Sequence, residues 1–395
     1  MRARLLLCLA ACALAGAGVA TAGGGPGQDN PTQGYGPNVR YARALGFCNV
    51  FHSVPRLRGC LIQQLLGLVV ASHDPANELP RIDAYLARTG GYAEANCHVL
   101  MHTVGRRYGR LAHVTLARLR EYLPRSNNAN CSAGFGHGLL TYLAPQLAAQ
   151  PPRQAVRQCY HVATRYQRYS CVHGFGHAYM RLYSEQIPPA LDLCRQMGPQ
   201  NAPDCAAGVF HDYWIAVAGL DATKAPPEVI LDPRILCSRQ AGGFVRGCWY
   251  RALLERPPAH HVRDAADVQR LCDGLTGIQD AGCVTAASVI SSSDPFAQMQ
   301  LCAAMRDGEA ADCARGVRAP ELGRSPAAQQ VQLIQRCAAF VRSAQHGCYT
   351  WLGTALNVVA DGRFAKRCGA LRYAGTRAAC RSGAARYEGP LETFS

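Results

Sequence analysis

The chain has 395 residues, a length too great for one small hydrophobic core, so several packed units are expected. It carries 41 Lys and Arg against 26 Asp and Glu, a formal net charge of +15 at pH 7. We interpret this surplus as a source of solubility or of attraction to an acidic cell envelope. The N-terminus predicts export, which excludes nucleic acid as an expected partner. No later apolar run is long enough to predict a transmembrane segment.

Residues 1–22 have the parts of a secretory signal peptide. A basic start precedes the apolar run Leu5–Ala11, and the small-x-small triplet Ala20-Thr21-Ala22 is typical of a cleavage site. We therefore predict cleavage after this triplet, a flexible N-terminal segment over 23–45, and a mature protein that is secreted or periplasmic. In an alternative interpretation, the leader is a lipoprotein signal and Cys12 anchors the mature chain through a lipid.

Cysteines are regularly spaced along the rest of the chain. Of the 20 cysteines, two lie in the predicted signal peptide, and the other 18 form nine successive pairs. Eight pairs enclose 10 or 11 residues, whereas Cys97 and Cys131 enclose 33. In an oxidising compartment this regularity predicts disulfides between nearest neighbours rather than thiolate metal sites, whose close C-x-x-C pairs are absent. The predicted bridges are Cys48–Cys60, Cys97–Cys131, Cys159–Cys171, Cys194–Cys205, Cys237–Cys248, Cys272–Cys283, Cys302–Cys313, Cys337–Cys348 and Cys368–Cys380.

The same spacing predicts a repeat of two helices. From Cys159 onward, the first cysteines of successive pairs lie 30 to 43 residues apart, a period typical of helical hairpins. Helically spaced apolar residues flank the pairs, as in Cys283–Ile290, and polar segments such as Asp307-Gly308-Glu309 lie within them. We predict an all-α array of about nine disulfide-stapled helical hairpins, either α-solenoid-like or a compact helical repeat stack. Each bridge is expected to contribute about 3 kcal/mol.

Histidines distinguish a His-rich half, residues 46–220, from a plainer structural half, residues 221–395. Six residues after the second cysteine, three consecutive units carry His137, His177 and His211, whereas most other units carry residues that suit packing. A Gly-Phe-Gly sequence precedes two of these histidines, although glycine inside a helix costs about 1 kcal/mol relative to alanine. The glycines therefore indicate close approach of another backbone, or of a bound group.

Two pairs of histidines have i, i+4 spacing, which places both side chains on one helical face: His98 with His102, and His173 with His177. The unit of His98 has the enlarged loop, in which we expect an extra helix around Val114–Tyr122 that caps or lines a functional face. If the units stack in register, these histidines converge on one metal site. The candidate ligands are His98, His102, His137, His173, His177 and His211; the other seven histidines lack this relation and are interpreted as ordinary.

An all-nitrogen ligand set determines the expected cofactor. Imidazole binds copper, zinc, iron and nickel, and the thiols are consumed in disulfides. We favour copper, including a pair of ions with three imidazoles each, over one zinc ion with a bound water. Non-covalent haem is a further alternative, because no C-x-x-C-H attachment sequence is present. Asp212 or Tyr213, beside His211, is a candidate proton donor or partner of a ligand.

The sequence supports two classes of function. The first is a secreted or periplasmic His-ligated metalloprotein, a metalloenzyme if the ion performs copper-type oxidation or zinc-type hydrolysis. The second is a non-enzymatic repeat scaffold that binds a protein or envelope polymer, with the histidines as ordinary core or surface residues. No nucleophile elbow, P-loop, dinucleotide fingerprint or H-E-x-x-H sequence appears. The substrate and any catalytic residue stay unknown at this level.

Overall fold

The computed structural model describes residues 37–123, 130–162, 165–219, 226–256, 258, 261–292 and 294–317, together with 337, 348–350, 368–369, 371 and 374–385. Every regular element within these ranges is a helix, so the all-α prediction is confirmed there. The predicted signal peptide, with Cys12, lies outside the described residues.

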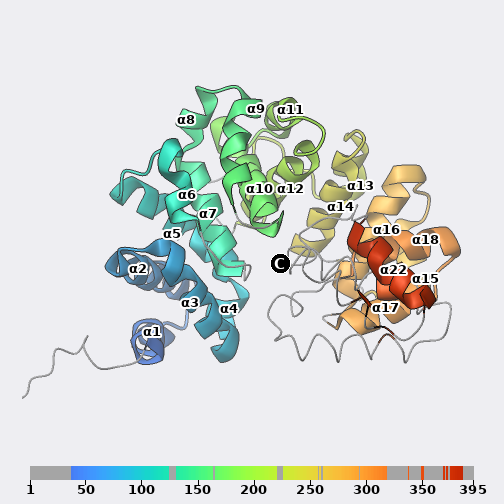
Figure 1. The fold of residues 1–395 in the computed structure, drawn as a ribbon, viewed down its shortest axis with the longest axis horizontal. Helices are drawn as coiled ribbons and strands as arrows, with labels where there is room; N and C mark the ends of the chain where they lie inside the picture. The colour runs from blue at the N-terminus through green and yellow to red at the C-terminus, as the bar shows by residue number, and fades with distance from the viewer. Residues whose placement is uncertain are drawn as a thin grey trace, which may run out of the picture.

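A central row of eight helices forms the main body of the described part of the chain, and each helix packs against the next in the row. In Figure 1 the row follows an arc, from α2 at one end, through α10 and α12, to α16 and α18 at the other. The row consists of α2 (Val54–Ser72), α5 (Cys97–Leu111), α7 (Asn130–Tyr142), α10 (Arg165–Leu182), α12 (Ala202–Val217), α14 (Phe244–Glu255), α16 (Gly277–Ser291) and α18 (Asp307–Arg315).

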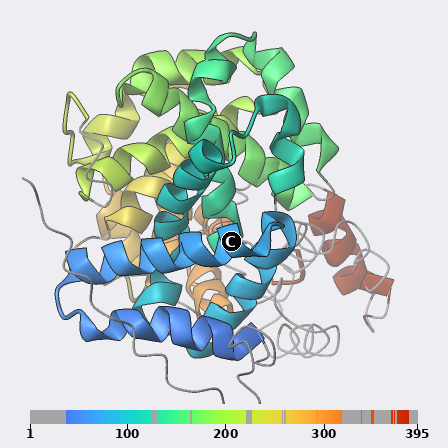
Figure 2. The same ribbon diagram turned by 90° about the vertical axis from the view of Figure 1, so that its left-hand side faces the viewer.

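The other described helices connect and flank the central row. Figure 2 shows one of them, α1, beside α2 at the start of the array. They are α1 (Pro37–Gly46), η1 (Phe47–Val50), α3 (Pro75–Thr89), α4 (Gly91–Ala95), η2 (Leu116–Arg118), α6 (Leu119–Tyr122), α8 (Ala144–Ala148), α9 (Pro152–Ala155), η3 (Val156–His161), α11 (Ile187–Gln196), α13 (Pro233–Ser238), α15 (Ala265–Cys272), α17 (Pro295–Ala303) and α22 (Ala374–Ala385).

Local sequence explains where several flanking helices begin. An Asp-Pro dipeptide starts α3, α13 and α17, and in each the aspartate is the N-cap and accepts a hydrogen bond from a backbone N–H of the first turn. The proline that follows needs no N–H partner at this position, because the first N–H groups of a helix lack intrahelical acceptors. These caps therefore define the residue at which each of the three helices begins.

All nine predicted nearest-neighbour disulfides are present, with Cα–Cα distances from 4.9 to 5.8 Å. In the four units from Cys194 to Cys313, the first cysteine lies near the end of one helix and the second lies inside the next. The expected turn Asp307-Gly308-Glu309 is instead the first turn of α18. The connections are thus shorter than predicted, because the helices begin before the second cysteine.

The bridge between Cys97 and Cys131 differs from the others, since it joins the first turns of α5 and α7. The enlarged segment between these cysteines contains nearly all of α5, followed by η2 and α6. The extra helix expected around Val114–Tyr122 is therefore present as two short elements.

The N-terminal part of the described chain corrects two expectations. Residues 37–45, assigned to a flexible segment, lie in α1, where Tyr41 is buried and donates a hydrogen bond of 3.0 Å to Glu78. Helix α2 is long and apolar enough to cross a membrane by length and composition alone, although no such run was expected. One such helix is weak evidence, because core helices of soluble proteins have the same composition. Leu61 and Leu65 of α2 are buried in the protein core.

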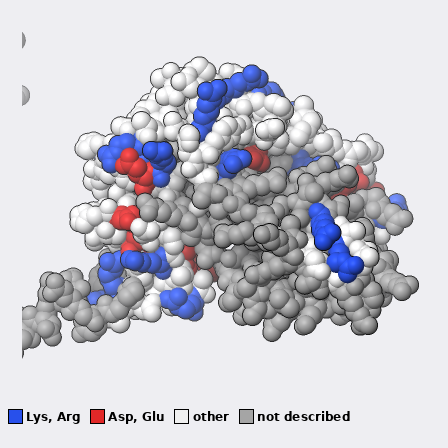
Figure 3. Space-filling model, in the orientation of Figure 1, with Lys and Arg blue, Asp and Glu red and all other residues white. Residues whose placement is uncertain are grey.

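Charged side chains are distributed rather than concentrated on the face drawn in Figure 3. Lys and Arg lie in separate groups over the described part of that face, several of them beside Asp or Glu. This distribution is compatible with interpreting the net positive charge as a general surface property.

Candidate metal centre

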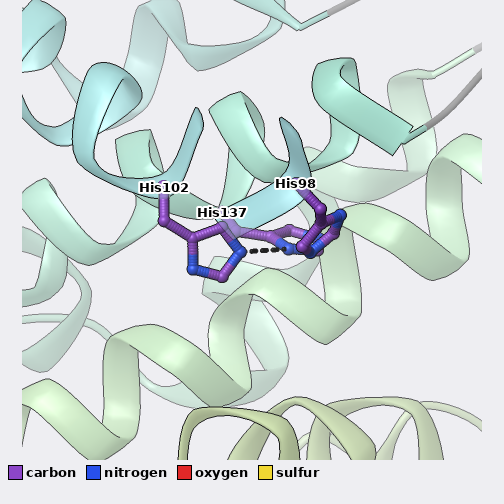
Figure 4. Close-up of side chains that lie close together, drawn as sticks. All are labelled: His98, His102 and His137. Atoms are coloured by element: carbon purple, nitrogen blue, oxygen red, sulfur yellow. Dashed lines mark hydrogen bonds between the residues drawn. The ribbon is translucent and has the colours of Figure 1, made fainter. Parts of the chain in front are cut away.

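Four consecutive helices of the central row bring the six predicted histidines together. His98 and His102 lie on α5, His137 on α7, His173 and His177 on α10, and His211 on α12. Eleven pairs of their rings have centroids only 4.5 to 5.9 Å apart. Five rings are buried, with at most 8% of each residue exposed, and His98 is half-buried. Figure 4 shows the first three, with the rings from α5 and α7 directed toward one another.

Glycines allow the helices to approach closely enough for this convergence. A Cβ added at Gly134 of α7 would overlap the His98 carbonyl oxygen, and one at Gly138 would overlap that of His102. On α12, a Cβ at Gly208 would overlap the carbonyl oxygen of His173. Close approach of a neighbouring backbone, the first explanation for the Gly-Phe-Gly glycines, is therefore correct for Gly134 and for Gly176, which meets the Cys205 carbonyl oxygen. The nearest atoms to Gly136 and Gly174 belong instead to side chains. Backbone contact between paired helices places their histidine rings within reach of one another.

Two carboxylates outside the cluster determine which ring nitrogen carries the proton. His177 Nδ1 lies 2.5 Å from Asp212 Oδ1, with both side chains fully buried, and His211 Nε2 lies 3.3 Å from Glu255 Oε1. An ionised carboxylate only accepts hydrogen bonds, so the nitrogen that faces it is the N–H donor. The opposite nitrogens, His177 Nε2 and His211 Nδ1, consequently carry lone pairs that can bind a metal ion.

Backbone and hydroxyl groups act in the same way on two further rings. His137 Nε2 lies 3.0 Å from the carbonyl oxygen of Ser170, an acceptor-only group, which assigns the lone pair to His137 Nδ1. His173 Nδ1 lies 3.0 Å from the hydroxyl of Tyr169, which can either accept or donate. His173 Nε2 is also hydrogen-bonded to His211 Nδ1, which carries a lone pair, so His173 Nε2 is the donor and the Tyr169 hydroxyl donates to His173 Nδ1.

Nitrogen–nitrogen distances in the cluster match those around an ion. Hydrogen bonds join two pairs of rings, with His102 Nε2 and His137 Nδ1 3.3 Å apart and His173 Nε2 and His211 Nδ1 3.2 Å apart. Two nitrogens bound at 2.0–2.1 Å to one tetrahedral ion lie about 3.3 Å apart. Three groups have ligand atoms within 4.8 Å of one another: His98, His102 and His137; His137, His173 and His177; and His102, His177 and Asp212. The arrangement could therefore hold a metal ion.

Burial keeps the cluster in the form that binds metals. Loss of hydration lowers the pKa of His137, His173 and His211 well below the usual histidine range. Nearby charge lowers these pKa values further, chiefly from the other imidazoles for His137 and from the Arg251 guanidinium for His173 and His211. Because a neutral imidazole is the ligand and a protonated one is not, the folded protein presents these rings ready for coordination.

The sequence predicted only some of the side chains that contact the histidine rings from outside the cluster. Asp212 was a candidate partner of a ligand and does contact one, His177, whereas the hydroxyl of Tyr213 instead bonds to the backbone of Ile230. Glu255 was missed, because it belongs to the half of the chain assigned a purely structural role. A signal existed: Asp212 and Glu255 each lie seven residues after the second cysteine of their unit, one residue beyond the position at which three units carry histidine.

The histidines interpreted as ordinary lie apart from the cluster where the structure describes them. His52, His73, His113, His161 and His261 are all outside the buried core, while His260 and His346 lie outside the described residues.

No family model matches the chain, and no curated protein or solved structure matches it significantly. The chemistry is therefore inferred from the site itself: a buried histidine cluster that could hold a metal ion, in a disulfide-rich helical protein. So many disulfides suggest an oxidising environment outside the cytoplasm.

Proposed function

We propose that this chain is an exported, His-ligated metalloprotein whose buried cluster binds copper and performs redox chemistry. The observation that carries the proposal is the convergence of six histidine rings from four helices, five of them buried. One or two buried imidazoles in a core would be ordinary, but imidazole is the commonest metal ligand and six such rings from four helices here meet at one place. A metal ion is the partner that accepts several lone pairs at once.

Copper is favoured over zinc by the donor set. The inner positions are imidazole nitrogens, and in the Irving–Williams order copper(II) binds such donors more tightly than the other divalent first-row ions do. The carboxylates of Asp212 and Glu255 lie behind two of the rings, where they orient the ligands and offset part of the ion's charge. Arg251 Nη1 lies 3.4 Å from Glu255 Oε1, so the positive guanidinium offsets part of the negative charge that Glu255 brings to the site.

The roles of the protein groups follow from these contacts. His98, His102 and His137 present nitrogens from α5 and α7, and the histidines of α10 and α12 complete the set. A bound copper ion would supply one-electron chemistry. Burial in the chain lowers the pKa of His137, His173 and His211 and so keeps these rings neutral. The carboxylates of Asp212 and Glu255 orient two rings, and the surrounding helices bury five of the six residues.

Metal analysis of the purified exported protein tests the proposal. We expect copper at stoichiometric levels in the wild type and its loss in the His137→Ala/His177→Ala double variant. The double variant His52→Ala/His161→Ala, which alters two exposed histidines outside the cluster, is the matched control and should retain the wild-type content. Wild-type protein that binds neither copper nor another transition metal would refute the proposal and leave the scaffold hypothesis. Zinc in place of copper would move the chemistry to hydrolysis.

A further inference from the structure

The N-terminal end of the central row has an apolar surface. Helix α2 is the first helix of the row, so the row continues on one side of it only, through α5. Helix α1 and η1 pack beside α2, at the end of the array that faces the viewer in Figure 2. Terminal units of a helical array normally present a polar outer face, because no further unit stacks on them. Here the large hydrophobic side chains left exposed between residues 37 and 72 are Val39, Phe47, Val50, Val54 and Val70.

Three of these side chains gather at the junction of η1 and α2. This junction patch consists of Phe47, Val50 and Val54, each at least 56% exposed. Phe47 and Val50 lie three residues apart in η1, and side chains at that spacing point the same way because a 3-10 helix has three residues per turn. The Cys48–Cys60 disulfide ties η1 to α2, so the patch is held in place.

A groove of about 420 Å³ adjoins the junction patch. It lies between residues of α1, η1, α2, α3 and α4, most of them apolar, including Leu45, Leu57 and Leu61. Asn49, which lies between Phe47 and Val50 in η1, also lines the groove. The uncovered apolar surface is therefore wider than the three side chains of the patch.

Residues 37–72 also carry positive charge without any acidic residue. The segment contains no Asp or Glu, and its Lys and Arg residues are Arg40, Arg43, Arg56 and Arg58. Arg43 precedes Phe47 by four residues, across Gly46, which has helical dihedral angles of φ −62° and ψ −30°. Arg58 follows Val54 by four residues in α2. Each of these two arginines thus shares a helical face with a patch residue, an arrangement typical of surfaces that enter an anionic membrane interface.

We propose that this end of the protein docks on a bilayer of anionic phospholipids. Phe47, Val50 and Val54 insert between the headgroups and the acyl chains, and Arg43 and Arg58 contact the lipid phosphates. Insertion removes the exposed apolar area from water, and little conformational entropy is lost because the disulfide already holds the patch. This docking is separate from the metal site and does not depend on it.

A second copy of the chain fits the same surface less well. In a symmetric dimer the same patch lies on both subunits, so the arginines of one copy would face those of the other. The segment offers no acidic residue to pair with them. A layer of anionic headgroups supplies the opposite charge, while the acyl chains below it cover the apolar side chains.

Binding to lipid vesicles tests the docking, with every protein a full exported chain that carries Cys12→Ser so that no lipid anchor can form. We expect binding to vesicles that contain phosphatidylglycerol and much weaker binding to vesicles of phosphatidylcholine alone. The patch variant Phe47→Ser/Val50→Ser/Val54→Ser should lower the partition coefficient about 100-fold, which is about fivefold for each side chain. Arg43→Gln/Arg58→Gln should lower it about 25-fold, and added salt should weaken the binding of the wild type.

The matched control is Val229→Ser/Leu231→Ser/Ile235→Ser, which alters three exposed apolar residues near the acidic Glu228 and Asp232. This variant should bind as the wild type does. The proposal is overturned if the wild type does not bind anionic vesicles, or if both triple variants lose binding equally. A wild-type dimer in analytical ultracentrifugation that the patch variant dissociates, without vesicle binding, would assign the patch to self-association instead. Circular dichroism establishes that each variant is folded.

Discussion

The close contact between α10 and α12 can be tested by adding a single methyl group. In Gly208→Ala, the new Cβ would overlap the His173 carbonyl oxygen and lie 3.2 Å from the Cα of Gly176. Both neighbours are backbone atoms, so no side chain can rotate away and the two helices must separate. Overpacking of this kind costs about 1–3 kcal/mol, and a backbone clash belongs at the upper end. Alanine regains about 1 kcal/mol of helix propensity, which leaves a net destabilisation of about 2 kcal/mol.

Gly59→Ala is the matched control, because Gly59 is an exposed residue within α2 and a Cβ added there would meet no atom within 4 Å. This variant gains helix propensity without a clash, so it should be more stable than the wild type by about 0.5–1 kcal/mol. Urea unfolding of the metal-free proteins measures both free energies. The copper affinity of Gly208→Ala should also fall, since separating α10 from α12 moves His173 away from His211. Equal stabilisation by both substitutions would refute the claim that glycine sets the helix spacing.

Three other perturbations address the site and its support. Asp212→Asn should weaken copper binding about 10- to 100-fold by removing the charge behind a ligand, whereas the exposed Asp192→Asn on α11 should leave the affinity unchanged in the same chelator competition. In the metal-free protein, burial lowers the pKa of three cluster histidines, so the unfolded chain binds more protons below about pH 6.5. The free energy of unfolding should then fall by about 1.4 kcal/mol per pH unit for each of these histidines, and a pH-independent urea midpoint between about pH 6 and 5 would contradict this. Replacing both Cys194 and Cys205 by alanine should lower stability by about 3 kcal/mol, measured by the same unfolding assay.

Periodicity explains why much of the fold could be predicted from the sequence. Cysteine spacing was enough for eight of the nine pairings, because a bridge that closes a short, repeated loop is favoured over distant alternatives, and Cys97–Cys131 is the pair that these eight leave. The sequence also shows that His137, His177 and His211 each lie six residues after the second cysteine of their unit. Equal distances from equivalent cysteines place side chains at equivalent positions in stacked helices. Their convergence follows from the repeat, together with the glycines that bring the helices into contact.

Contacts between units could not be predicted in the same way. Glu255 reaches His211 because α14 packs against α12. The offset that Glu255 shares with Asp212 marks it as a candidate, but that offset does not reveal which neighbouring ring it contacts. The carbonyl of Ser170 is a backbone group, so its hydrogen bond to His137 leaves no trace in the residue type. Helix starts were also misplaced, as at Asp307, because the polar residues that suggest a turn are equally suited to the first turn of a helix.

The position of the disulfides relative to the cluster has an energetic consequence. Where the four histidine-bearing helices meet, imidazoles and glycines replace the large apolar side chains that would normally drive packing, so this part of the core gains less from burial. The Cys97–Cys131 bridge joins α5 to α7, while Cys171 and Cys205 tie α10 and α12 to the flanking elements η3 and α11. Each of these four helices thus has a disulfide within two turns of a cluster histidine. A cross-link stabilises the fold by restricting the unfolded chain, an effect that does not depend on how polar the core is. The disulfides therefore allow the protein to keep a polar, water-excluded centre preformed, at which a metal ion would add stability by binding only the folded state.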